Sequence, residues 1–125
     1  MRRSLPAADI AALSEPGRLE AAQLSVHECL RNGTHGAAWD IRLYVRTFDF
    51  SLSSIRIPIH LFHGAENRNV PIALVRSKIR SLPTATLSEF PDDAHLSLLC
   101  NHFDEIALVL KGETSKPEPK AILQN

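Results

Sequence analysis

The sequence predicts a mixed α/β fold, with helices first and then a strand–helix–strand–helix unit that contains two parallel strands. Apolar residues recur at helical spacing through much of the first half. Two short β-rich apolar runs follow, and an amphipathic segment of helical length separates them. Two strands joined by a helix are expected to be parallel, with a right-handed crossover.

Three helices are expected in the first half of the chain. The first covers about residues 5–13, with Pro6 in its first turn. The second covers 18–31 and stops at Asn32-Gly33, because both residues tolerate the left-handed conformation. The third covers about 37–47, where Trp39 is interpreted as a core or cap-packing aromatic or, alternatively, as a pocket-lining one. The apolar residues at helical spacing are Leu19, Ala22, Val26, Leu30, Trp39 and Leu43.

The second half is expected to hold two strands and two helices. The first strand covers 58–62 and begins at Pro58, because proline cannot donate to a strand ladder. A helix over about 72–81 ends before Pro83, since the residue before proline resists the α conformation. A second strand over 84–90 and a final helix over 96–110 follow. The residues predicted to face the core are Ile72, Val75, Ile79, Leu82, Leu99, Phe103, Ile106 and Leu110.

Composition excludes several classes of protein. The formal net charge is zero, so the basic face typical of nucleic-acid binding is not expected. No apolar run reaches the length of a membrane span, and no signal peptide begins the chain, so a cytoplasmic protein is expected. Cys29 and Cys100 are interpreted as reduced, mostly buried thiols. His60 and His63 should point to opposite faces of one strand, and no metal or cofactor is predicted.

Two motifs carry the functional prediction. His63-Gly64-Ala65-Glu66-Asn67-Arg68-Asn69-Val70-Pro71 follows the first predicted strand, and Asp93-Ala94-His95-Leu96 follows the second. Together they resemble the acid loop and the histidine loop at the end of an α/β-hydrolase. The resemblance covers roughly residues 5–110, and the upstream helices resemble the end of a cap. It implies a cap-like helical segment over 1–54, the C-terminal part of the hydrolase core over 55–111, and a disordered tail over 112–125.

The resemblance places His95 at the general base and Asn67 at the acid, with Glu66 as an alternative acid. Loops at the carboxyl ends of adjacent parallel strands lie together, so these side chains should meet. Asn67 could accept a hydrogen bond from the Nδ1–H of His95 through its amide oxygen, but it carries no charge. In a serine protease the same change costs about four orders of magnitude in turnover.

The nucleophile of such an enzyme is missing, because the 125 residues contain no Gly-x-Ser-x-Gly. We therefore expect a truncated hydrolase relative for small esters or amides that is inactive alone. A small-molecule substrate is expected only if a nucleophile-bearing chain completes the site. The alternative is a non-catalytic interaction or complementing module that pairs with another chain, or with itself, through an exposed sheet edge. Neither nucleic acid nor membrane is an expected partner.

Four polar or thiol positions near His95 are assigned no chemistry. Asp92 and Asp93 are interpreted as two solvated carboxylates in a turn. Ser97 is expected to be an exposed first-turn residue, and Cys100 a core residue, of the last helix.

Overall fold

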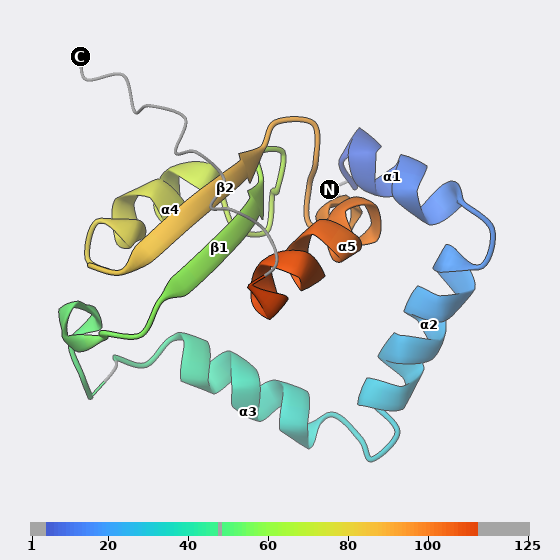
Figure 1. The fold of residues 1–125 in the computed structure, drawn as a ribbon. Coiled ribbons are helices and arrows are strands. Elements are labelled where there is room, and N and C mark those ends of the chain that lie inside the picture. Colours follow the sequence, from blue (N-terminus) through green and yellow to red (C-terminus); the bar gives the residue numbers. More distant parts are fainter. Residues whose placement is uncertain (1–4, 48, 113–125) are drawn as a thin grey trace.

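The computed structural model describes residues 5–47 and 49–112, and within them the predicted order of elements is confirmed (Figure 1). Each element begins and ends within a few residues of its predicted bounds. A short 3-10 helix, Leu52–Ser54, precedes the first strand. The helices and strands are α1 (Ala7–Ser14), α2 (Arg18–Cys29), α3 (His35–Tyr44), β1 (Ile59–Gly64), α4 (Ile72–Ile79), β2 (Ala85–Phe90) and α5 (Ser97–Lys111). The predicted tail lies outside the described residues beyond Gly112.

The two strands form a parallel sheet, which confirms the mixed α/β class. The register runs from the pair Ile59–Ala85 to the pair Gly64–Phe90. Helix α4 connects the strands and contacts β2, whereas α5 contacts β1, and the two helices lie on different sides of the strands (Figure 1). The predicted apolar face of α4 is half-buried, because Ile72, Val75 and Ile79 are less exposed than the residues between them. Because the strands are parallel, both end at the same edge of the sheet, and the loops that follow them meet there.

Gly64 allows the two loops to approach closely. A Cβ atom at this position would lie 2.4 Å from the carbonyl oxygen of Ala94 and 2.5 Å from that of Asp93. Beyond it, the N–H of Glu66 donates to the carbonyl of Asp93 at 2.9 Å, and the N–H of Ala65 donates to that of Phe90 at 2.9 Å. Only glycine fits here without moving backbone, so this residue brings the loop after β1 against the loop after β2.

The three N-terminal helices contact the rest of the structure less and less along the chain. Helix α1 packs on α5, and α2 contacts α1. Helix α3 lies clear of the sheet, and no described element makes extensive contact with it (Figure 1). None of the helices in the described part of the chain is long and apolar enough to cross a bilayer.

Several residues expected to be buried on α2 and α3 are exposed. The interpretation of Trp39 as a core aromatic and of Cys29 as a buried thiol is wrong, since both are exposed. An apolar stripe on a helix is buried only where a second layer faces it, and the described residues supply none. The other large apolar residues of these two helices that are exposed are Leu19, Leu24, Val26, Ile41, Leu43 and Tyr44.

The predicted core face of α5 is also largely wrong. Leu99, Phe103 and Leu110 are all more than half exposed. The helix is kinked at His102, where φ is −123° and ψ is 19°, so a single helical period does not continue through it. Ser97, expected to be exposed, is completely buried at the start of this helix. The buried side of α5 thus begins with a hydrogen-bonded polar residue, not with the predicted leucine row.

Candidate active site

The structure brings together two of the three predicted site residues. Asn67 lies in the loop after β1 and is buried, with 8% of its surface exposed. His95 lies in the loop after β2 and is exposed. Nδ2 of Asn67 and Nδ1 of His95 are 3.3 Å apart. The parallel register accounts for this meeting, because both loops leave the same edge of the sheet.

The amide of Asn67 has only one orientation that satisfies its neighbours. Its Oδ1 accepts hydrogen bonds from the backbone N–H groups of Asn69, at 2.9 Å, and of Val70, at 3.1 Å. Exchanging the oxygen and nitrogen would set the amide N–H₂ against these two donors. The nitrogen therefore faces His95, and the expectation that the amide oxygen accepts from His95 is wrong.

This orientation decides which tautomer of His95 is compatible with the contact. An amide N–H₂ can only donate, so Nδ1 of His95 must accept and carries no proton. Neutral His95 then holds its proton on Nε2. A general base needs the reverse arrangement, with Nδ1 protonated and the lone pair of Nε2 free to take a proton from the nucleophile. Asn67 therefore reverses the polarity of the contact as well as removing its charge.

Glu66, the alternative acid, takes part in the contact between the two loops through its backbone. Its backbone N–H binds the carbonyl of Asp93, and its side chain is exposed. Within the described residues this side chain makes no hydrogen bond or ion pair, to His95 or to any other group. In this structure the carboxylate of Glu66 therefore does not orient His95.

Asp93 is not the solvated turn residue that the sequence predicts. It is buried, and its Oδ2 lies 2.8 Å from Nε2 of His102. Its Oδ1 accepts from the side-chain amide of Asn101 at 2.9 Å, while Nδ1 of His102 lies 3.2 Å from Glu105. Asp92 is exposed, as expected. The partners of Asp93 lie on α5, and no local sequence pattern indicates this pairing.

Asp9 is a further buried residue, and it belongs to neither of the two loop motifs. It belongs to α1, and 1% of its surface is exposed. Its Oδ1 accepts from the backbone N–H groups of Leu96, at 2.8 Å, and of Ser97, at 2.9 Å. The two donors follow His95 directly. The separation of 87 and 88 residues along the chain explains why no motif reveals this contact.

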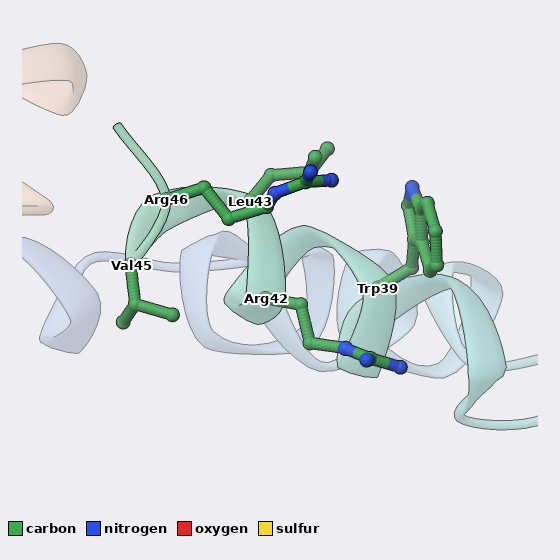
Figure 2. A pocket seen from close by; sticks show the side chains of 5 residues that line it. All are labelled: Trp39, Arg42, Leu43, Val45 and Arg46. Carbon is green, nitrogen blue, oxygen red and sulfur yellow. The ribbon is translucent and has the colours of Figure 1, made fainter. Parts of the chain in front are cut away.

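A hollow lies on α3 (Figure 2), the helix that runs clear of the sheet (Figure 1). The guanidinium carbon of Arg42 lies 5.8 Å from the centre of the Trp39 ring. All the lining residues belong to α3 or to the two positions after it, so the hollow is an open helix face and not an enclosed ligand site. They are Trp39, Arg42, Leu43, Val45 and Arg46. Among the described residues, no group of three or more His, Cys, Asp and Glu side chains could hold a metal ion.

Comparison with protein-family models, with curated proteins and with solved structures finds no match. The resemblance to the α/β-hydrolases therefore stays a prediction from the two loop motifs.

Proposed function

We propose that this chain is an α/β-hydrolase-like protein that keeps the histidine end of the catalytic apparatus and does not catalyse hydrolysis alone. The observation that carries the proposal is the contact between Asn67 and His95. A histidine and a short polar side chain from two strand-end loops lie together, as a base and its orienting residue would. In this contact the proton of neutral His95 lies on Nε2, so Nε2 has no free lone pair with which to act as a base.

Two further observations support the proposal. Gly64 gives the two loops a close backbone approach at the carboxyl ends of parallel strands, which is where reactive groups gather in sheets of this kind. The 125 residues contain no Gly-x-Ser-x-Gly turn. A nucleophile supplied by another segment or another chain would be needed for small esters or amides to become substrates.

An ester hydrolysis assay tests the proposal. We expect the purified chain to release p-nitrophenol from p-nitrophenyl acetate slowly and without saturation. His95→Ala and the control His27→Ala, which removes another exposed histidine, should reduce the rate by similar small amounts. Saturable turnover that only His95→Ala abolishes would show that the chain is an active hydrolase and would overturn the proposal.

The second candidate function is that of an interaction module, and the open edge of β1 favours it. The N–H of Ile59 donates to the carbonyl of Thr84, just before β2, and the N–H of Ala65, just after β1, donates to that of Phe90. The backbone groups of the odd-numbered residues of β1 therefore face β2. The backbone groups of His60 and Phe62 therefore face the other edge, where the described residues supply no further strand. Unpaired edges of this kind recruit another chain.

Light scattering over a concentration series tests this second function. We expect association that His60→Pro weakens, because proline removes the N–H that faces the open edge. His60→Ala is the control, since both variants lose the contact between Nδ1 of His60 and the hydroxyl of Thr86, 3.1 Å apart. A clean monomer at high concentration, or equal effects of the two variants, would contradict pairing through β1.

A further inference from the structure

The loop that carries His95 is held by the residues around the histidine. Ala94 and Ser97 are both completely buried, whereas His95 between them is exposed. The backbone N–H of Ala94 donates to the hydroxyl of Ser97 at 2.7 Å. The imidazole itself has one hydrogen bond in this part of the chain, the 3.3 Å contact with Asn67, which is long for such a bond. The position of the imidazole therefore depends on its backbone.

Asp9 supplies two further restraints on this backbone. One carboxylate oxygen receives the N–H groups of the two residues that follow His95, at 2.8 and 2.9 Å. These amides begin α5, where Leu96 occupies the N-cap position and has no side chain that could cap the helix. The first N–H groups of a helix need an acceptor from outside, and the helix dipole favours a negative one. A residue of α1 thus caps α5 from about ninety residues away along the chain.

We propose that Asp9 is a positioning residue for His95, which fixes the backbone after the histidine and so holds the imidazole against Asn67. Hydrogen bonds from amides to an ionised oxygen are shorter and stronger than those to a neutral one, so two on a single oxygen restrain the loop tightly. This inference rests on the proposed function only in treating His95 as the reactive group. The geometric part of the inference stands on the contacts of Asp9 alone.

NMR of the full chain tests the positioning role with Asp9→Ala, Asp9→Asn and the control Asp40→Ala, which removes an exposed carboxylate on α3. The first readout is the NOE between the side-chain amide of Asn67 and the Hε1 proton of His95. The second is hydrogen exchange at the amides of Leu96 and Ser97. Asp9→Ala should abolish the NOE and speed exchange by about tenfold or more, the factor expected for loss of a hydrogen bond to a charged group.

Asp9→Asn separates positioning from general stability. Its amide oxygen can still accept both N–H groups, so the NOE should persist and exchange should quicken less than in Asp9→Ala. Asp40→Ala should change neither readout. An NOE and exchange rates that survive in folded Asp9→Ala would overturn the proposal. So would global unfolding of both Asp9 variants, which would make Asp9 a residue of general stability. Both readouts are structural, so the outcome of the ester assay does not affect them.

Discussion

Replacing Asn67 with aspartate should reverse the direction of its hydrogen bond with His95. In the present structure Oδ1 of Asn67 is taken by the backbone amides of Asn69 and Val70, and Nδ2 faces the imidazole. An aspartate in the same rotamer would keep the two backbone bonds on one oxygen and would place its second oxygen against Nδ1. That oxygen can only accept, so the proton of neutral His95 should move from Nε2 to Nδ1.

The size of this change follows from the strength of the new bond. A hydrogen bond to a charged group contributes about 1.5–3 kcal/mol. This range corresponds to a shift of the tautomer ratio by about 10-fold to about 150-fold. Because His95 is exposed, water competes for its proton and the lower end of the range is expected.

The tautomer is measured from the side-chain ¹⁵N shifts of His95 at a pH where the imidazole is neutral. Asn69→Asp is a matched control, because it adds the same charge two residues further along the exposed loop without facing Nδ1. It should leave the Nε2–H tautomer in place. Our account of the Asn67 amide would be refuted if the wild-type chain already carried its proton on Nδ1. It would also fail if Asn67→Asp left the proton on Nε2.

The same variant has a consequence for activity wherever a nucleophile-bearing partner or a longer form completes the site. Asn67→Asp should then raise turnover, because the base acquires the correct tautomer and a negative partner for the imidazolium. Glu66→Gln is the companion variant in the unmodified complex. Loss of activity in Glu66→Gln, with no gain in Asn67→Asp, would assign the acid to Glu66 instead.

Two predictions concern the scaffold around the site. Gly64→Ala should lower the free energy of unfolding by about 1–3 kcal/mol, because its Cβ would lie 2.4 Å from the carbonyl oxygen of Ala94. Chemical denaturation measures this against Gly36→Ala, where a Cβ meets nothing within 4 Å; equal losses would disprove the steric argument. The hydrogen bond from Arg76 lowers the pKa of Glu89, so their ion pair stabilises the fold at neutral pH. That stabilisation is complete at pH values above about 4.3, the pKa of a glutamate in the unfolded chain. It is lost as the pH falls through the lower pKa that Glu89 has in the folded protein. Arg76→Gln should therefore destabilise the chain more at pH 7 than at pH 3 in urea unfolding, and an equal loss at both pH values would contradict this.

The elements of the fold could be predicted from the sequence because their signals are local. Helix α2 leads to a turn at Gly33, where φ is 90°, as the Asn-Gly stop predicts. Strand β1 begins just after Pro58, which cannot donate to a ladder. The loops that follow the two strands meet because parallel strands end at one edge, so the proximity of Asn67 and His95 could also be predicted.

The burial of the helices could not be predicted in the same way. A helical apolar stripe indicates which residues share a face, but not whether anything packs against that face. Trp39 and Phe103 lie on such stripes and are both exposed. The kink at His102 further breaks the period on which the prediction for α5 depended.

The sequence by itself determined the order of the elements, the parallel pairing of the strands and the two loops that meet. These features follow from residue spacing, from proline and from glycine, which act over a few neighbouring residues. Only the tertiary structure decided the direction of the hydrogen bond between Asn67 and His95. The direction of the Asn67 amide depends on which backbone N–H groups reach its oxygen. The hydrogen bonds of Asp9 to the backbone after His95 depend on the packing of α1 against α5, more than eighty residues away along the chain. Hydrogen bonds of this kind are set by the folded arrangement of distant segments, and no local pattern encodes them.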